Sequence, residues 1–301
     1  MTTPTLSAPP PATESPQLSP GGRTAIRAIL VLAAALLVVG CVAGLGATSW
    51  GIGSLRVAAD EKVLPADART LVLDVGDVPA AVRIVADRDA REPRVRMRVL
   101  NSSRSDDRNL VVSRDGAATR VTIDAAPASS LTRWEAAPLL VDSAGEITVT
   151  LPPEQARQLS LTVYQNRGVL VTETDLDQLD VKGTNGDVVL GGGARRAEIH
   201  TRKGDVASHG PVSVTESFVA ESVDGDLSVD FADVAPQTLR AVTSTGDITV
   251  SLPQPGPYLV NASGDSSSVR VPQTNDPARA VATVTARSDV GDVAVESSHR
   301  R

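Results

Sequence analysis

Aromatic side chains are scarce in this sequence of 301 residues, which has two Trp, two Tyr and two Phe, or 2% in all. So few large side chains cannot fill the core of a conventional globular domain of this size. Stacked coils do not need them, because each coil covers its neighbours and Val, Ile, Leu and Ala are sufficient. The scarcity of aromatic residues therefore favours a repeat architecture.

Cysteine and histidine are also rare, with one Cys and three His. A single Cys excludes an intrachain disulfide and a zinc site built from several cysteines. The histidines His200, His209 and His299 lack the spacing of paired metal ligands, and His200 is expected on the exposed face of a strand. The sequence also lacks a Gly-x-Ser-x-Gly nucleophile motif and a phosphate-binding Gly-x-x-x-x-Gly-Lys-Ser/Thr loop. We therefore expect that the protein is not an enzyme and has no catalytic residue, metal site or cofactor.

The charged residues show no basic cluster in the second half of the chain. The net charge is −7, with 22% charged and 41% hydrophobic residues. This composition fits neither a fully disordered chain nor one wholly embedded in a membrane. It also argues against nucleic acid as a partner, since such binding depends on Lys and Arg contacts to phosphate.

What the sequence does contain is the recurring dipeptide Gly-Asp, at steps of 18, 21, 21, 18 and 27 residues. A fixed period near twenty residues is typical of repeat architectures. Most pairs are followed by an alternation of apolar and polar residues that predicts a half-buried strand. A weaker form of the repeat extends back to Gly145 and Gly168, where Asp is absent. The pairs are Gly186-Asp187, Gly204-Asp205, Gly225-Asp226, Gly246-Asp247, Gly264-Asp265 and Gly291-Asp292.

Each Gly-Asp pair is expected to form a tight corner before a strand. Glycine reaches backbone conformations with positive φ at no steric cost, and aspartate hydrogen-bonds nearby backbone amides. One unit, from Gly186 to Lys203, is predicted to hold two strands, at 187–190 and 197–201. Gly191-Gly192-Gly193 is predicted as a further corner. Such units, stacked one on another, predict an all-β, single-stranded β-helix or solenoid-like repeat domain.

Stacking would align four of the aspartates in a column, with three arginines close in sequence. They are Asp187, Asp205, Asp226 and Asp247, and Arg195, Arg196 and Arg202. Calcium-binding β-rolls also bring aspartates together, but their nonapeptide period is about half of the one found here. Some β-helix enzymes use Asp and Arg side chains to cleave acidic polysaccharides. We favour a third interpretation, in which the aspartates serve the turns and line a solvated edge.

The N-terminal part of the chain is predicted to anchor the protein in a membrane. Residues 1–24 are rich in Pro, Ser and Thr and are predicted to form a disordered cytoplasmic tail. Residues 25–49 are predicted to form one transmembrane helix, since Ala28–Ala47 is an unbroken apolar run long enough to cross a bilayer. Two arginines at its start favour an N-terminus inside the cell. Residues 50–69 are then predicted to be a linker.

Cys41 offers an alternative to the uncleaved anchor. Val38-Val39-Gly40-Cys41 resembles the lipobox of lipoproteins, in which the cysteine is lipidated and becomes the mature N-terminus. The apolar run continues past Cys41, which favours the single-pass anchor. Both alternatives place the following domain outside the cytoplasmic membrane. Gly40 and Gly44 also form a Gly-x-x-x-Gly spacing, which predicts a weak homodimer through the transmembrane helix.

Residues 70–298 are predicted to form one β-repeat domain, with its strongest repeats at 145–297. The first part contains five runs of strand character, separated by turn signals. In one of them Val95, Met97 and Val99 face one way and arginines face the other, as in a strand with one solvated face. Residues 126–138 lack this alternation and are predicted to be an irregular loop. The five runs are 70–75, 81–85, 94–100, 110–113 and 119–125.

Three glycine-led motifs resemble those of the bacterial "putative adhesin" β-repeat family, a domain family of unknown function. They are Thr184-Asn185-Gly186-Asp187-Val188, Val223-Asp224-Gly225-Asp226-Leu227 and Ser244-Thr245-Gly246-Asp247-Ile248. The resemblance covers about residues 70–297. It implies one N-terminal membrane helix followed by repeated glycine-led strands, and it carries over no catalytic residues. Members are associated with envelope-stress regulators, which keeps a signalling role open.

The leading hypothesis is a membrane-anchored, extracytoplasmic β-solenoid that binds or scaffolds at the bacterial cell envelope without catalysis. Long stacked sheets offer extended surfaces for an envelope protein or a glycan. The alternative is a membrane protein that senses envelope stress and reports it inward through the N-terminal tail. A second alternative is a polysaccharide-active β-helix enzyme.

Overall fold

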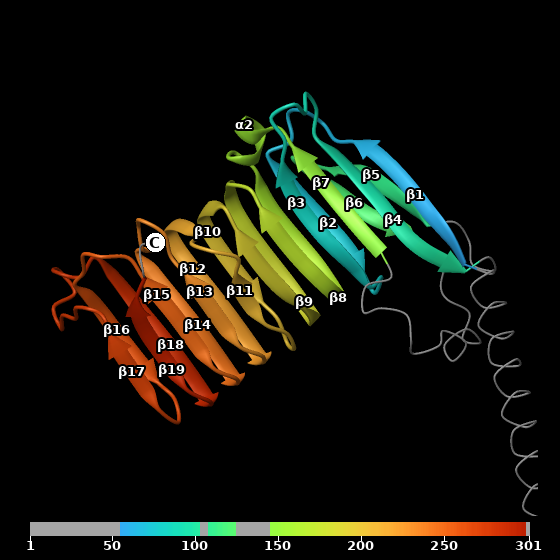
Figure 1. Ribbon diagram of the computed structural model, residues 1–301. Helices are drawn as coiled ribbons and strands as arrows, with labels where there is room; N and C mark the ends of the chain where they lie inside the picture. The colour runs from blue at the N-terminus through green and yellow to red at the C-terminus, as the bar shows by residue number, and fades with distance from the viewer. Residues whose placement is uncertain (1–54, 103–107, 125–144, 299–301) are drawn as a thin grey trace, which may run out of the picture. The chain divides into compact units, whose positions relative to one another are not determined.

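The computed structural model describes residues 55–102, 108–124 and 145–298, and their regular structure is almost all strand (Figure 1). The chain divides into two units, 1–55 and 56–301, and the second is described below. The predicted transmembrane helix at 25–49, with Cys41, and the predicted loop at 126–138 lie outside the described residues. Within those residues no helix has the length and apolar character needed to span a bilayer.

The described elements are nineteen strands and one helical turn, α2 (Pro153–Ala156). In chain order the strands are β1 (Leu55–Val63), β2 (Thr70–Gly76), β3 (Ala80–Ala86), β4 (Arg94–Ser102), β5 (Asn109–Asp115), β6 (Ala118–Asp124), β7 (Gly145–Leu151), β8 (Ser160–Glu173), β9 (Leu176–Gly191), β10 (Gly193–His200), β11 (Val206–Ser208), β12 (Ser213–Asp224), β13 (Leu227–Asp230), β14 (Thr238–Thr245), β15 (Ile248–Leu252), β16 (Tyr258–Ser263), β17 (Ser267–Arg270), β18 (Ala282–Val290) and β19 (Val293–Ser297).

These strands form two sheets that are joined through the long strands β8 and β9, each of which contributes its first half to one sheet and its second half to the other. The first sheet runs β5, β6, β2, β8, β9, β10, β12, β14, β18, β16. The second runs β1, β4, β7, β3, β8, β9, β11, β13, β15, β19, β17. The described registers are parallel except β4–β7 and β5–β6, which are antiparallel.

Each coil therefore supplies one strand to each sheet, and equivalent residues of successive coils stack in register. The apolar residue after each Gly-Asp corner shows this, because five of them form one buried column. They are Val188, Val206, Leu227, Ile248 and Val293. The buried side chains of both sheets make one continuous hydrophobic cluster, mostly of Val, Leu, Ile and Ala. The two Phe of the chain, Phe218 and Phe231, pack edge to face at 5.2 Å within it. The predicted all-β, solenoid-like fold is thus confirmed.

The spatial order of the coils departs from their chain order at both ends. The coil β2–β3 lies between β6–β7 and β8, and the coil β18–β19 lies between β14–β15 and β16–β17 (Figure 1). The expectation of coils stacked in sequence order is therefore wrong at the ends. At the C-terminal end this change of order falls within the longest step of the repeat, the 27 residues from Gly264 to Gly291. The extra residues between β17 and β18 allow the chain to pass β17 and place β18 next to β14.

The glycines of the corners also form a column, and their backbones approach too closely for a side chain to fit. A Cβ on Gly225 would lie 2.1 Å from the carbonyl oxygen of Gly204, and a Cβ on Gly246 would lie 2.2 Å from that of Gly225. Gly204, Gly225, Gly246 and Gly291 have φ between +133° and +156°, a region that favours glycine. The predicted glycine corners are confirmed at these four positions and at Gly192 (φ +82°). The corner predicted at Gly186 is wrong, because Gly186 lies inside the continuous strand β9, which also contains the strand predicted at 187–190.

Gly264-Asp265 does not continue this column as the sequence pattern predicts. Ser267 pairs with Val293, so Ser266 lies opposite Asp292, the position that aspartate occupies in the other coils. The amide of Asp265 donates to the carbonyl oxygen of Gly291. At the other end, Ala80 lies between Gly168 and Gly145 in the column, because the coil β2–β3 is inserted there.

The strands predicted in the first half of the chain all form, within one or two residues of the expected bounds. Val95, Met97 and Val99 are buried, while Arg96 and Arg98 are exposed, as the alternation predicts. The predicted linker at 50–69 is wrong in part, since β1 occupies 55–63 and pairs with β4. Its Arg-Val-Ala-Ala-Asp-Glu-Lys-Val sequence lacks the alternation and the large apolar residues that mark a strand.

We expect Gly246→Ala to destabilise the protein by about 3 kcal/mol, since it combines an unfavourable φ with a collision against neighbouring backbone. The matched control is Gly116→Ala, where φ is +62° but nothing lies within 4 Å of the added Cβ; it should cost about 1 kcal/mol. Chemical unfolding of both variants measures the difference. Equal losses would show that the close approach of the corners does not matter.

Candidate functional site

Three polar features of the described residues could support a function. The first is the aspartate column at the corners. The second is a chain of ion pairs centred on Arg195. The third, which we call the arginine groove, lies on the outer face of β4 and β7.

The aspartate column forms as predicted, and the structure shows what its side chains do. The backbone amide of each aspartate donates to the Oδ1 atom of the aspartate in the preceding coil. The distances are 3.0 Å for Asp205 to Asp187 and 2.8 Å for Asp226 to Asp205, Asp247 to Asp226 and Asp292 to Asp247. All five aspartates are exposed. One carboxylate oxygen of the first four is therefore committed to holding the next coil in register, which is the turn role expected from the sequence.

The structure does not bring the arginines expected near this column to it. Arg195 and Arg196 form ion pairs with Asp177 and Glu216 of the first sheet instead. Arg202 makes no ion pair with the column in the described part of the chain. Nor do those residues include a group of three or more His, Cys, Asp or Glu placed to hold a metal ion.

Buried hydroxyl groups form a second row of hydrogen bonds at the corners, the hydroxyl ladder, which the sequence pattern did not lead us to expect. Ser222, Thr243 and Ser288 are buried, and their hydroxyls donate to the carbonyl oxygens of glycines in the neighbouring coil. The acceptors are Gly204 at 3.4 Å, Gly225 at 3.0 Å and Gly246 at 2.7 Å. The signal was present, because a Ser or Thr stands three residues before Gly204, Gly225, Gly246 and Gly291.

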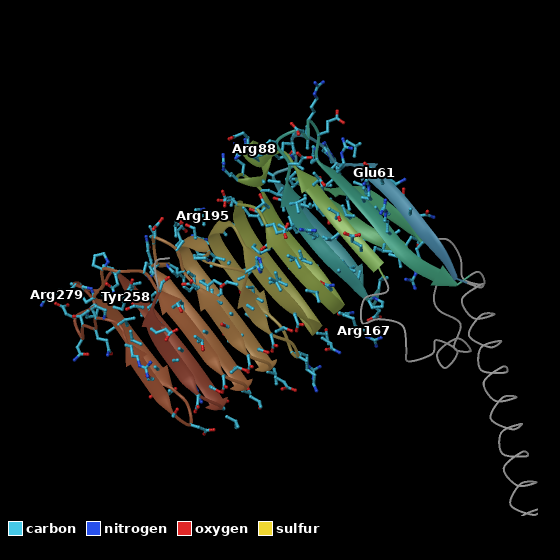
Figure 2. The ribbon with its side chains drawn as sticks, in the orientation of Figure 1. Glu61, Arg88, Arg167, Arg195, Tyr258 and Arg279 are labelled. Atoms are coloured by element: carbon cyan, nitrogen blue, oxygen red, sulfur yellow. The ribbon has the colours of Figure 1, made fainter. Side chains whose placement is uncertain are left out.

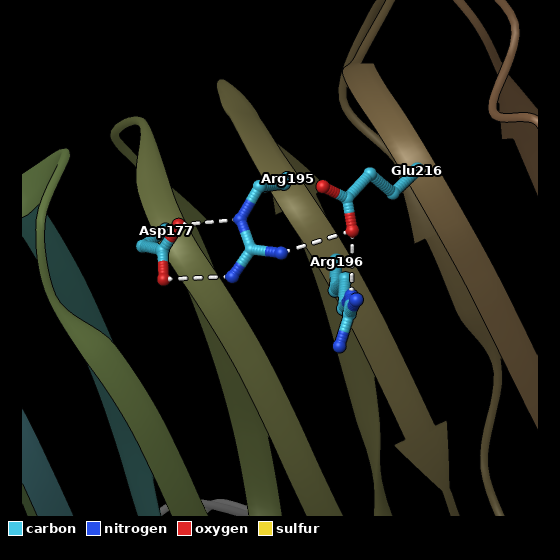
Figure 3. Close-up of polar contacts among 4 residues, drawn as sticks. All are labelled: Asp177, Arg195, Arg196 and Glu216. Atoms are coloured by element: carbon cyan, nitrogen blue, oxygen red, sulfur yellow. Dashed lines mark hydrogen bonds and ion pairs between the residues drawn. The ribbon is translucent and has the colours of Figure 1, made fainter.

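The ion-pair chain ties three consecutive coils together (Figure 3). Arg195 contacts both oxygens of Asp177 at 2.8 and 3.1 Å and Glu216 at 2.9 Å, while Arg196 contacts Glu216 at 2.8 Å. Arg195 lies at a bulge where β10 shifts its register against β12, which turns its side chain toward both neighbours. The hydrogen bond from Arg195 lowers the pKa of Asp177, and those from Arg196 and then Arg195 lower the pKa of Glu216. These charges are already paired within the protein.

His200 also lies in a paired network on the outer face of the first sheet. Its Nε2 atom is 2.8 Å from Glu198 and its Nδ1 atom is 3.3 Å from Glu221, which also binds Arg240 at 2.8 Å. The imidazole is half-buried. His209 is exposed, and His299 lies outside the described residues.

The arginine groove is a hollow of about 450 Å³ at the end of the second sheet. Its floor is the outer face of β4, where Arg94, Arg96 and Arg98 alternate with buried residues, and of β7. The antiparallel register places Arg94 opposite Thr150, Arg96 opposite Thr148 and Arg98 opposite Glu146. One side is formed by the loop after β3. The described residues that line it are Asp87, Asp89, Ala90, Arg94, Arg96, Arg98, Glu146, Thr148 and Thr150.

Glu61 of β1, labelled in Figure 2, contacts two arginines of this groove and so lies at its edge. Its Oε1 atom is 3.2 Å from Arg94, and its Oε2 atom is 3.0 and 2.9 Å from two nitrogens of Arg96. Hydrogen bonding to Arg96 lowers the pKa of Glu61, so the carboxylate is ionised at neutral pH. The buried Nε atom of Arg94 has no hydrogen-bond partner. Arg98 makes no ion pair among the described residues.

The family model described as Toastrack DUF4097 matches residues 140–299 of this chain. The chain belongs to the Toastrack DUF4097 family. This confirms the expected resemblance over that range, although the match begins at residue 140 rather than near residue 70. β7 of the arginine groove thus falls inside the matched Toastrack region, whereas β1, β3 and β4 precede it.

Several solved structures resemble the Toastrack protein at low sequence identity. A "putative adhesin" from Parabacteroides merdae is 10% identical, with a TM-score of 0.43, covering 80% of this chain and 96% of that one. A "putative cell adhesion protein" from Clostridium sporogenes is 11% identical, with a TM-score of 0.39, covering 81% and 100%. A "putative lipid binding protein" from Parabacteroides distasonis is 12% identical, with a TM-score of 0.36, covering 82% and 96%. No curated protein matches the chain.

Thr243→Val should destabilise the Toastrack domain by about 1–3 kcal/mol, because the carbonyl oxygens of Gly225 and Thr245 lose a buried donor while the side-chain volume is kept. Thr249→Val is the matched control, since Thr249 lies on the outer face of β15 and is only partly buried. It should be nearly neutral. Chemical unfolding compares the two, and similar effects would contradict a role for the hydroxyl ladder.

Arg195→Met should remove stability that depends on pH. Because the folded pKa values of Asp177 and Glu216 are lowered, their contribution is present above the unfolded carboxyl pKa of about 4 and is lost as the pH falls through the folded values. The difference in thermal midpoint between wild type and variant should therefore be largest near neutral pH and shrink below about pH 4. Arg279→Met, at an exposed position, should run parallel to wild type across the same range. A constant deficit for Arg195→Met at every pH would rule out the ion-pair explanation.

Proposed function

We propose that this Toastrack protein is a membrane-anchored, extracytoplasmic binding module that acts at the bacterial cell envelope without catalysis. The observation that carries the proposal is the arginine groove, where three arginines of β4 line one hollow. The corner carboxylates of the scaffold, by contrast, already bind its own backbone. A glycan or an envelope protein is the partner that such a groove suits. The apolar run at 28–47 supplies the anchor.

The aspartate column supports a binding role over polysaccharide cleavage. An acid and base pair in an enzyme needs carboxyl groups with free oxygens at a site where a substrate can approach. Here the Oδ1 atoms of Asp187, Asp205 and Asp226 accept backbone amides of the next coil. The arginines that would complete such a site are bound to Asp177 and Glu216.

Sensing of envelope stress is a second candidate, and it rests on the position of Glu61. This residue belongs to β1, the first described strand after the predicted membrane segment, and it is held by arginines of the groove. A ligand that enters the groove would therefore meet the strand that leads toward the membrane.

The proposal is tested with the full chain expressed in a bacterial host. The protein should sediment with membranes, resist carbonate extraction, and be digested by a protease added to spheroplasts, while a chain lacking residues 1–49 should leave the membrane fraction. Cys41→Ser separates the two anchors, because only a lipoprotein loses its lipid and its cleavage before residue 41, a change in mass that mass spectrometry of the purified protein detects. Detergent-solubilised protein should also retain polysaccharide or protein from solubilised envelopes. A full chain found in the soluble fraction, or one that retains nothing, would refute the proposal.

A further inference from the structure

Glu61, at the edge of the arginine groove, supplies an anion of the protein itself to two of its arginines, and this indicates what they can bind. Asp87, Asp89 and Glu146 line the groove as well. Glu61 reaches from β1 to the guanidinium groups of Arg94 and Arg96 with three contacts of 2.9–3.2 Å. One carboxylate therefore serves two cations. Arg98, further along the same strand, has no anion among the described residues, although Glu146 lies opposite it in the sheet register.

The row of arginines has the geometry of a multidentate anion site. Alternate residues of an antiparallel strand are about 7 Å apart, so the three guanidinium groups follow one line along β4. Arginine presents planar, paired donors that match carboxylate and phosphate groups. The Nε atom of Arg94 is a donor already removed from water and still without a partner, which is a cost that an added acceptor would relieve.

The remaining lining shows that the anion should be carried by a polyhydroxylated molecule. The hollow of about 450 Å³ is far larger than one carboxylate or phosphate. Asp87 and Asp89 offer acceptors and Thr148 and Thr150 offer hydroxyls, which suit the hydroxyl groups of a sugar. Among the described residues that line the groove, Ala90 is the one apolar residue and none is aromatic, so they offer little surface to a lipid tail or an apolar peptide side chain.

We propose that the arginine groove binds an acidic saccharide, whose anionic group displaces Glu61 from Arg94 and Arg96 and extends to Arg98. This rests on the proposed binding function and names its ligand class. The displaced Glu61 loosens one attachment of β1, which keeps its pairing with β4 and the hydrogen bond from the Leu110 amide to Asp60 Oδ2 at 2.9 Å. Occupancy of the groove is thereby coupled to the strand that leads to the N-terminal segment.

The experiment uses full-length protein in a non-ionic detergent and two probes, an oligogalacturonate and its methyl ester, which keeps the hydroxyls and removes the charge. Calorimetry should show binding of the acid and not of the ester, weakening as salt is raised. Arg98→Gln should weaken binding by about tenfold to a hundredfold, the loss of one charge-assisted contact. Glu61→Gln should strengthen it by about tenfold, because the competing internal anion is gone. Arg240→Gln, on the first sheet and paired with Glu221, is the control and should leave binding unchanged.

A purely structural role for Glu61 predicts the opposite sign, because loss of the carboxylate would only weaken the site. Hydrogen exchange of the β1 amides provides the second readout, and saccharide should raise exchange in wild type. The proposal is overturned if the ester binds as well as the acid, if neither binds, or if Glu61→Gln weakens binding. It is also overturned if inorganic phosphate or phosphatidylglycerol vesicles bind as tightly as the saccharide. Any of these results would leave the proposed binding function untouched, because that function is tested separately by whether the full chain retains envelope material.

Discussion

The rest of the structure depends on the close approach of one glycine backbone to the next at the corners of the coil. The carbonyl oxygens of Gly204, Gly225 and Gly246 lie 2.1–2.2 Å from where a Cβ of the following corner glycine would be. Coils that approach this closely bring the Asp amide of one within reach of the Asp carboxylate of another, and a buried hydroxyl within reach of a glycine carbonyl. The glycine column, the aspartate column and the hydroxyl ladder are thus three results of a single spacing.

The periodic part of the fold could be predicted from the sequence because its cause is local. Gly225-Asp226 followed by Leu227-Ser228-Val229 specifies a corner and a strand without reference to anything distant. The order of the coils could not be predicted in this way. β14 pairs with β18 and not with β16, and no local sequence signal favours one of these neighbours over the other. The misplacement of Gly264-Asp265 has the same origin, because the motif is intact while its register is set by the coil on which it packs.

The candidate site was hidden for a related reason. The arginines of β4 were recognised as one solvated face, but the sequence gives no sign that Glu61, 33 and 35 residues earlier, would meet Arg94 and Arg96. Elsewhere on the surface, opposite charges meet between neighbouring coils, as Arg83 with Glu173 and Arg240 with Glu221. The groove differs in two ways: the carboxylate that meets Arg94 and Arg96 comes from β1, far earlier in the chain, and Arg98 has no ion pair among the described residues.

The interchange of coils at the C-terminal end has a consequence for how the protein is made. Translation delivers β16 and β17 before β18 and β19, yet both earlier strands pair with the later ones rather than with β14 and β15. The earlier pair therefore cannot reach its final place while the ribosome is still adding the residues that follow it. Until β18 and β19 emerge, the growing sheets end in β14 and β15, and the roughly thirty residues between β15 and β18 have no strand on which to take their final place.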